Sequence, residues 1–303
     1  MALSLTEVVP SLRALDVSIN RITTINAVNL PNLQFLHLDR NCIEYISGLK
    51  GLKALTTVSW REQNLQNAGN NSAVQFEPLS DVSILRMSGN RLHYFAPKIS
   101  FLNLQRLELA SAGLEGLAED FGLQMPNLRF LNLNYNALKD IRPLLGITKL
   151  VELYIAGNRV SRLRRTAAVL RKLGNTLQIL DCRGNPLTVG FYSSVLPPQN
   201  KGQQLVAHKP RSCSEPNDDN QEDTSASRYI VPPTNEHDDH QYRQTLNEDT
   251  ALRRRVYELL ILGDCPVLTR LDGLGIERSA VVDKDGVWQR LVELGVIQEK
   301  DGA

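Results

Sequence analysis

Four arginines recur between residues 40 and 106 at intervals of 20 to 25 residues. They are Arg40, Arg61, Arg86 and Arg106. A guanidinium group forms paired hydrogen bonds with carboxylates and phosphates, so clustered arginines favour recognition of acidic or phosphorylated groups. Glu62 and Glu108 lie close to these arginines in the sequence. The alternative is therefore a solvated surface on which the two glutamates neutralise the arginines.

Aromatic and amide side chains form a second candidate set at similar spacings. They are Phe35, His37, Phe130, Asn132, Tyr135 and Tyr154. Tyrosine and arginine contribute disproportionately to the binding energy of protein interfaces. The two sets together are the predicted partner-binding residues, provided that the fold brings them onto one surface.

An internal repeat sets the positions of these residues. The pattern Leu-x-x-Leu-x-Leu-x-x-Asn-x-Leu aligns eight times, beginning at Leu12, Leu33, Leu55, Val82, Leu104, Leu128, Leu150 and Leu177. The fourth, sixth and eleventh positions are apolar in every copy. A pattern of this kind with a period of 20 to 29 residues is typical of leucine-rich repeats. The chain resembles that family over residues 1–192 and again near 250–275.

The resemblance implies an α/β solenoid with a parallel β-sheet on its concave face. The convex side would hold 3-10 turns and short helices, and a helical cap would close the C-terminal end. Because side chains alternate along a strand, positions four and six point into the shared core and positions three, five and seven point outward. The predicted partner-binding residues occupy positions three, five, seven and eight. We therefore expect one concave surface that binds an extended acidic or phosphorylated peptide across repeats two to seven.

The ninth position of the repeat is asparagine in six of the eight copies. An asparagine amide has donors and an acceptor, so it can satisfy backbone groups of adjacent turns. Gln63 and Ala112 break the pattern, and at Ala112 we expect water or a shifted backbone. Trp60 is large for an inward leucine position, so the third repeat, with residues 67–71, is the expected irregular turn.

Composition restricts the class of protein. The 303 residues are 42% hydrophobic with a net charge of +1, which predicts no general attraction to nucleic acid or membrane. Neither a signal peptide nor a membrane span is recognisable, and the four cysteines show no paired spacing, so we expect a reducing, cytoplasmic setting. The sequence shows no nucleophile–base pair and no phosphate-binding loop. We therefore expect no enzyme activity, no small-molecule substrate and no cofactor. The run His-Asp-Asp-His at 237–240 is read as solvated, so no metal is expected.

The chain divides into three predicted parts. Repeats fill residues 1–192, an acidic and largely disordered or surface-draped insert fills 193–248, and the cap with a terminal helix fills 249–303. Residues 201–250 contain ten acids and five Lys or Arg. Such a segment buries too little surface to offset its ordering entropy. Val287, Leu291 and Leu294 predict an amphipathic helix that seals the end of the solenoid. The front end lacks an obvious cap, so we expect a fragment of a longer protein.

The segment from Thr250 to Leu274, the helix that follows it and the acidic insert inside the cap carry a narrower resemblance. They are similar to the leucine-rich repeat domain of fungal spindle-pole-body scaffolds of the septation-initiation and mitotic-exit networks, related to animal centriolin. That resemblance implies a scaffold anchored at the spindle pole body by a protein partner. Two alternatives stay open: a phosphatase-regulatory adaptor, and a ribonucleoprotein subunit suggested by the basic stretch 159–172.

Overall fold

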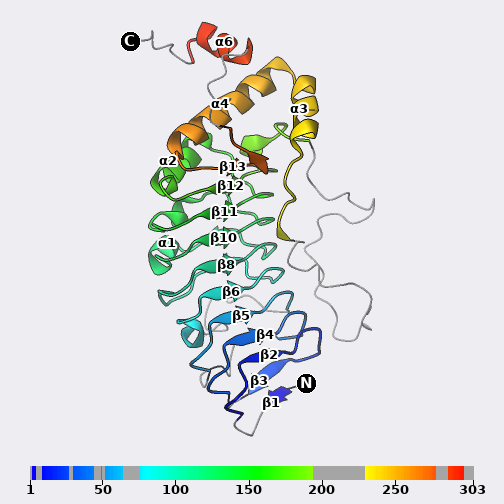
Figure 1. Cartoon of the computed structure of the whole chain (residues 1–303), viewed down its shortest axis with the longest axis vertical. Coiled ribbons are helices and arrows are strands. Elements are labelled where there is room, and N and C mark those ends of the chain that lie inside the picture. The colour runs from blue at the N-terminus through cyan, green and yellow to red at the C-terminus, as the bar shows by residue number, and fades with distance from the viewer. Residues whose placement is uncertain are drawn as a thin grey trace.

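Short strands stacked in series form the body of the computed structural model (Figure 1). The structure describes residues 2–4, 9–26, 30–43, 49, 52–63, 76–193, 229–277 and 286–296. The irregular loop predicted at residues 67–71 lies outside these residues, and so does most of the insert.

One ten-stranded sheet runs along the stack in the order β14-β13-β12-β11-β10-β8-β6-β5-β4-β2. All neighbouring pairs are parallel except the last two strands, β13 and β14. The strands are β2 (Ala14–Asp16), β4 (Phe35–His37), β5 (Thr57–Ser59), β6 (Ile84–Arg86), β8 (Arg106–Glu108), β10 (Phe130–Asn132), β11 (Glu152–Tyr154), β12 (Ile179–Asp181), β13 (Arg270–Leu271) and β14 (Leu274–Gly275). The first eight correspond to positions three to five of the eight repeats. The predicted parallel solenoid is therefore confirmed.

The core consists of the inward repeat positions. From the second repeat onward, the fourth and sixth positions are all at most 2% exposed, because each strand covers the apolar edge of the next. Trp60 fits its leucine position with no exposed surface, and β5 stays in register with both neighbours. The third repeat is therefore regular at its strand.

A ladder of side-chain amides joins successive turns. The Asn136 amide donates to the carbonyls of Leu109 and Leu133, and its Oδ1 accepts from the amides of Ala112 and Leu114. Where Ala112 interrupts the ladder, its backbone carbonyl accepts from Leu92 at 2.9 Å. The backbone carbonyl of Ala112 therefore takes the place of the missing side-chain acceptor for this amide.

The eighth position of every repeat adopts a left-handed backbone conformation, with φ between 50° and 75°. The residues are Ile19, Arg40, Glu62, Gly89, Ser111, Tyr135, Gly157 and Gly184. Only three of them are glycine, the residue that tolerates this region without steric cost. The chain therefore turns in the same way after each strand, and these residues form a row along one edge of the sheet.

The convex side is built from short elements, as predicted. The helical turns are η1 (Glu77–Leu79), α1 (Phe121–Gln124), η2 (Arg142–Leu144) and η3 (Pro186–Thr188); α2 (Leu163–Leu173) is longer. Two small parallel sheets pair β1 (Ala2–Ser4) with β3 (Thr24–Asn26), and β7 (Tyr94–Phe95) with β9 (Gly116–Leu117). Most of the basic stretch 159–172 thus lies in helix α2, whose apolar side is buried.

Helices α3 (Glu236–Thr245), α4 (Glu248–Asp264) and α6 (Gly286–Glu293) follow the repeats (Figure 1). Helix α4 packs against α2, and α6 packs against α4 with Leu291 buried, whereas Leu294 is 53% exposed. The amphipathic helix therefore covers α4 and does not lie on the last strand.

The sequence predicts an insert that is largely disordered or draped over the surface, and its described part, residues 229–248, is not disordered. Asn235 and Asn247 cap α3 and α4, and Asp239 makes two hydrogen bonds to the buried Arg254 at 2.8 and 2.9 Å. The contact holds α3 against α4, although the composition of the segment alone predicts a loose chain. Residues 229–248 therefore fold together with the cap helices.

Cysteine pairing also differs from the expectation. Cys182 and Cys265 are buried free thiols, but Cys42 is disulfide-bonded. Separately, no helix among the described ranges is long and apolar enough to cross a bilayer.

Candidate functional site

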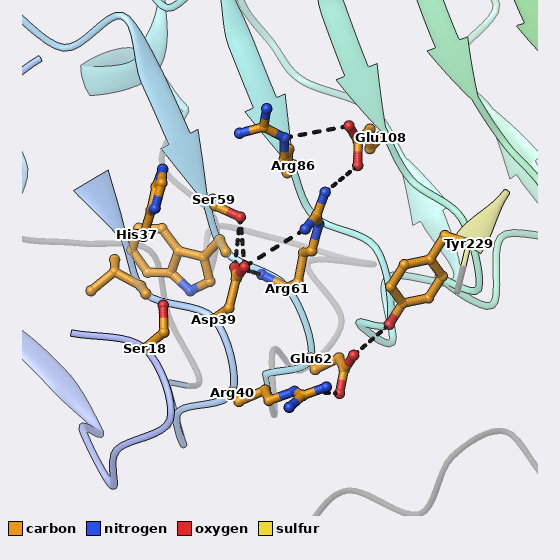
Figure 2. Close-up of polar contacts among 12 residues, drawn as sticks. Ser18, His37, Asp39, Arg40, Ser59, Arg61, Glu62, Arg86, Glu108 and Tyr229 are labelled. Carbon is orange, nitrogen blue, oxygen red and sulfur yellow. Dashed lines mark hydrogen bonds and ion pairs between the residues drawn. The ribbon is translucent and has the colours of Figure 1, made fainter. Parts of the chain in front are cut away.

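Three of the predicted arginines converge on one buried glutamate. Glu108 Oε2 lies 2.6 Å from Arg61 Nη2. Glu108 Oε1 lies 2.7 Å from Arg106 Nε and 3.4 Å from Arg86 Nε. Figure 2 shows Arg61 and Arg86 reaching Glu108 from neighbouring turns. Strands β6 and β8 supply three of these side chains, and Arg61 follows β5. We name Arg61, Arg86, Arg106 and Glu108 the arginine cluster.

Charge pairing dominates the electrostatics of the arginine cluster. Burial raises the pKa of Glu108, but Arg61 and Arg106 outweigh burial and hold the pKa of this carboxyl below its usual range. Burial lowers the pKa of the Arg86 guanidinium, and the neighbouring arginines lower it further against the attraction of Glu108. One carboxylate therefore serves three cations, so the arginines are not fully neutralised.

Asp39 supplies the second carboxylate next to the arginine cluster. It accepts hydrogen bonds from the Ser59 hydroxyl at 2.7 Å and the Arg61 amide at 2.7 Å, and lies 3.9 Å from Arg61 Nη1 (Figure 2). Burial raises the pKa of Asp39, and the bonds from Arg61 and Ser59 offset this in part. Counting Asp39 and Glu108 against three arginines leaves one positive charge in excess.

Exposure separates the members of the arginine cluster. The side chain of Arg61 is 8% exposed, whereas those of Arg86 and Arg106 are 24% and 34% exposed. Among the described residues, the terminal nitrogens of Arg86 and Arg106 have no hydrogen-bond partner. These nitrogens are therefore donors that an incoming anion could use.

Arg40 lies apart from the arginine cluster. It belongs to the left-handed row and its Nε lies 3.4 Å from Glu62 (Figure 2). The four arginines thus form a group of three and one separate pair. The glutamate neutralisation weighed as the alternative does occur at Glu62, and it occurs in part at Glu108.

The aromatic set extends the arginine cluster along the sheet. The Arg106 guanidinium stacks 3.6 Å from the centroid of the Phe130 ring, and Phe130 contacts Tyr154 at 5.4 Å between centroids. The Tyr154 hydroxyl donates to Glu152, and burial together with this carboxylate raises the pKa of the phenol. Arg106, Phe130 and Tyr154 therefore form a connected row across β8, β10 and β11.

The remaining predicted residues lie elsewhere on the same face. Phe35 is 42% exposed on β4, where His37 lies 3.8 Å from Asp16. Tyr135 belongs to the left-handed row and packs against Gly157. Asn132 is only 1% exposed and donates to the carbonyl of Tyr229. The structure thus brings five of the ten predicted residues together: Arg61, Arg86, Arg106, Phe130 and Tyr154.

Sequence reasoning missed a segment that lies over this face. Residues 229–234, here called the strap, run alongside the strand edges before α3 (Figure 1). The Tyr229 hydroxyl donates to Glu62, and its carbonyl accepts from Asn132 and Asn134. The only signal in the sequence is the apolar run Tyr-Ile-Val-Pro-Pro inside an otherwise polar insert.

The described residues contain no set of side chains suited to bind a metal ion. Within the described ranges, no group of three or more His, Cys, Asp or Glu residues could hold an ion. In the run His-Asp-Asp-His, Asp239 is already ion-paired with Arg254. The chemistry that the site can offer is recognition of anionic and aromatic groups.

Comparison with known proteins gives the family. The family model described as "Leucine Rich repeats (2 copies)" matches residues 10–51 and 126–166. The septation initiation network scaffold protein cdc11 of Schizosaccharomyces pombe is 30% identical over 257 residues, which cover 82% of this chain and 23% of that protein. This chain therefore spans about a quarter of the length of that relative.

Other similar proteins share shorter or weaker matches. The leucine-rich repeat-containing G-protein coupled receptor 5 of Xenopus tropicalis is 28% identical over 45% of this chain and 15% of its own length. Human 5T4, known from a crystal structure, has 22% sequence identity to this chain and a TM-score of 0.45. The match covers 60% of this chain and 74% of the 5T4 chain. By its repeats, its parallel sheet and the family match, the chain belongs to the leucine-rich repeat proteins.

Proposed function

We propose that this chain is a non-catalytic protein-interaction domain of a signalling scaffold that acts at the spindle pole body in mitotic exit and septation. Its similarity to the septation initiation network scaffold over most of its length supports this role. A solenoid sheet offers many side chains from successive turns, which suits an extended protein partner. The domain anchors the scaffold by binding a segment of a spindle-pole protein.

The arginine cluster indicates the chemistry of that segment. The terminal nitrogens of Arg86 and Arg106 are partly exposed and point to an anionic ligand, a phosphate or a carboxylate. This observation carries the proposal. The Glu108 carboxylate already takes one bond from each arginine, so the ligand adds to an arrangement that is set before binding.

Magnitudes decide how much else the ligand must contact. A charge-assisted hydrogen bond contributes roughly 1.5–3 kcal/mol, and micromolar affinity needs about 8 kcal/mol. Two arginines alone fall short once ordering costs are included. Phe130 and Tyr154 lie next along the sheet, and strands are spaced about 4.8 Å apart. A segment crossing from β6 to β11 therefore needs only about five extended residues to meet both groups.

Peptide binding tests the anionic specificity. The probe is a fluorescent decapeptide with two phosphoserines, compared with its unphosphorylated form by anisotropy on the 303-residue chain. We expect Arg86→Gln with Arg106→Gln to weaken binding of the phosphorylated form at least 10-fold. Arg142→Gln with Arg159→Gln removes the same charge from the convex side and should change it less than 2-fold. Equal affinity for both peptide forms, or equal loss in both variants, would exclude the arginine cluster.

Capture from dividing fungal cells tests the cellular role and the open alternatives. The tagged chain is used as bait with and without phosphatase treatment of the lysate. Recovery of spindle-pole-body proteins that is lost after phosphatase treatment is the expected result. Recovery of phosphatase catalytic subunits would favour a phosphatase-regulatory adaptor, and recovery of spliceosomal proteins with RNA would favour a ribonucleoprotein subunit.

A further inference from the structure

The strap occupies the edge of the concave face in the manner of a bound peptide. Its inward residues Tyr229 and Val231 are 3% and 5% exposed, whereas Pro232 and Pro233 are exposed. Among the described residues, Thr234 makes the strap's one backbone–backbone hydrogen bond, to Gly273 in the cap, and side chains of the repeats make most of its other contacts. A segment held in this way can be exchanged for another with the same groups.

Tyr229 is the most specific of these contacts. Its hydroxyl donates to Glu62 Oε1 at 3.0 Å (Figure 2), and its carbonyl accepts from the amides of Asn132 at 3.0 Å and Asn134 at 3.1 Å. The two asparagines are at most 1% exposed, so they depend on this carbonyl. Both ends of one residue are thereby recognised.

Gly89 provides the space for the tyrosine ring. A Cβ at Gly89 would lie 2.3 Å from the Tyr229 hydroxyl oxygen and 2.8 Å from Glu62 Cγ. The turns on either side of Gly89 carry Glu62 and Ser111 at this left-handed position, whereas Gly157 and Gly184 also lack a side chain there. The absence of a side chain at Gly89 therefore makes a notch that fits a phenol, and the Glu62 carboxylate beside it would repel a phosphorylated one.

Arg183 holds the other end of the strap. Its Nη1 donates to the Thr234 hydroxyl at 2.8 Å and its Nη2 lies 3.4 Å from the Val231 carbonyl. The Thr234 amide donates to Gly273 at 3.1 Å. The strap thus spans from the third repeat to the cap, with recognised groups at Tyr229, Val231 and Thr234.

We propose that this edge is a second peptide-binding surface, separate from the arginine cluster, whose ligand is an extended segment carrying an unphosphorylated tyrosine. The notch at Gly89 and Glu62 takes the phenol, Asn132 and Asn134 take the carbonyl of the same residue, and Arg183 takes a carbonyl two residues later. The strap is the intramolecular form of this ligand. A partner segment binds by displacing it.

Tethering explains why the strap governs access. A segment on the same chain acts at an effective concentration near the millimolar range, so a free peptide competes poorly with it. The apparent affinity for a partner is reduced by the fraction of molecules in which the strap has left. Weakening the strap should therefore raise affinity for the same sequence supplied in trans.

The probe is a labelled peptide with the sequence of residues 228–236, Arg-Tyr-Ile-Val-Pro-Pro-Thr-Asn-Glu, measured by anisotropy on the full 303-residue chain. We expect Tyr229→Ala to bind this peptide at least 10-fold more tightly than the unchanged chain. Tyr94→Ala removes another tyrosine, 44% exposed on β7, and should leave binding as in the unchanged chain. Tyr229→Phe, which keeps the ring in the notch, should give an intermediate increase.

Two further arms test the notch itself. In the Tyr229→Ala background, Glu62→Ala should weaken peptide binding at least 10-fold, and so should a phosphate on the peptide tyrosine. Circular dichroism establishes that each variant is folded. Equal peptide affinity of the Tyr229→Ala, Tyr229→Phe and unchanged chains, or tighter binding of the phosphorylated peptide, would overturn the proposal. Because Arg86 and Arg106 take no part, this result is independent of the arginine cluster.

Discussion

Replacing Asn136 by alanine tests the amide ladder that holds the repeats in register. Asn136 is 8% exposed and bridges the fifth and sixth turns. Its Oδ1 accepts from the amides of Ala112 at 3.0 Å and Leu114 at 2.9 Å, and its Nδ2 donates to the Leu109 carbonyl at 2.9 Å. Among the described residues these three backbone groups have no other hydrogen-bond partner.

The expected loss follows from those three groups. An unsatisfied buried donor or acceptor costs about 1–3 kcal/mol. The Leu133 carbonyl is spared, because it also accepts from Asn158. Allowing for local relaxation and entry of water, Asn136→Ala should lower the free energy of unfolding by about 4 kcal/mol.

Asn20 provides a matched control, since it fills the same repeat position at the exposed first turn and donates only to Val17 and Ser18 nearby. Asn20→Ala should cost about 1 kcal/mol or less. Urea unfolding, followed by far-ultraviolet circular dichroism and by the fluorescence of the buried Trp60, measures both variants. A loss for Asn136→Ala within 1 kcal/mol of that for Asn20→Ala would refute the reasoning.

Three further predictions concern charge and backbone strain. Glu108→Gln should lower the free energy of unfolding at pH 7 by about 3 kcal/mol, because it removes a charged partner of the buried Arg61. Since the folded pKa of Glu108 is lowered, the stability difference between the variant and the unchanged chain should shrink below pH 4.5. A stability difference that is constant with pH would contradict this. Burial, aided by Asp181, raises the pKa of Asp272 to about 7, so the contribution of this carboxyl to stability is present below pH 4 and is lost as the pH rises toward 7. The free energy of unfolding should therefore fall by about 2 kcal/mol between pH 5 and 7 because of this group. Asp272→Asn should be less stable, but in urea titrations its free energy of unfolding should lack this dependence on pH. Ile19→Gly should stabilise the chain by up to about 1 kcal/mol, because a β-branched residue is strained at φ 55°. Thermal unfolding measures this change. A melting temperature below that of the unchanged chain would count against the strain.

The solenoid could be predicted from the sequence because a repeated pattern states the same local structure many times. Each apolar position had eight independent occurrences, and each reports which side of a strand faces the core. The strands at positions three to five and the burial of Leu131, Leu133 and Leu138 follow from that period. The interruption at Ala112 could also be recognised from the sequence, because alanine offers no side-chain hydrogen bond to the adjacent turns.

Only the tertiary structure decided how the face of the sheet is used. The pattern places Arg61, Arg86 and Arg106 on one surface, but it does not say that all three share Glu108, which depends on side-chain rotamers and on a contact 47 residues apart in sequence. The strap follows no period at all, and Tyr229 reaches Glu62 across 167 residues. Periodic sequence fixes a scaffold because it acts locally and repeatedly, whereas these contacts are single, long-range events that arise only once the turns are stacked.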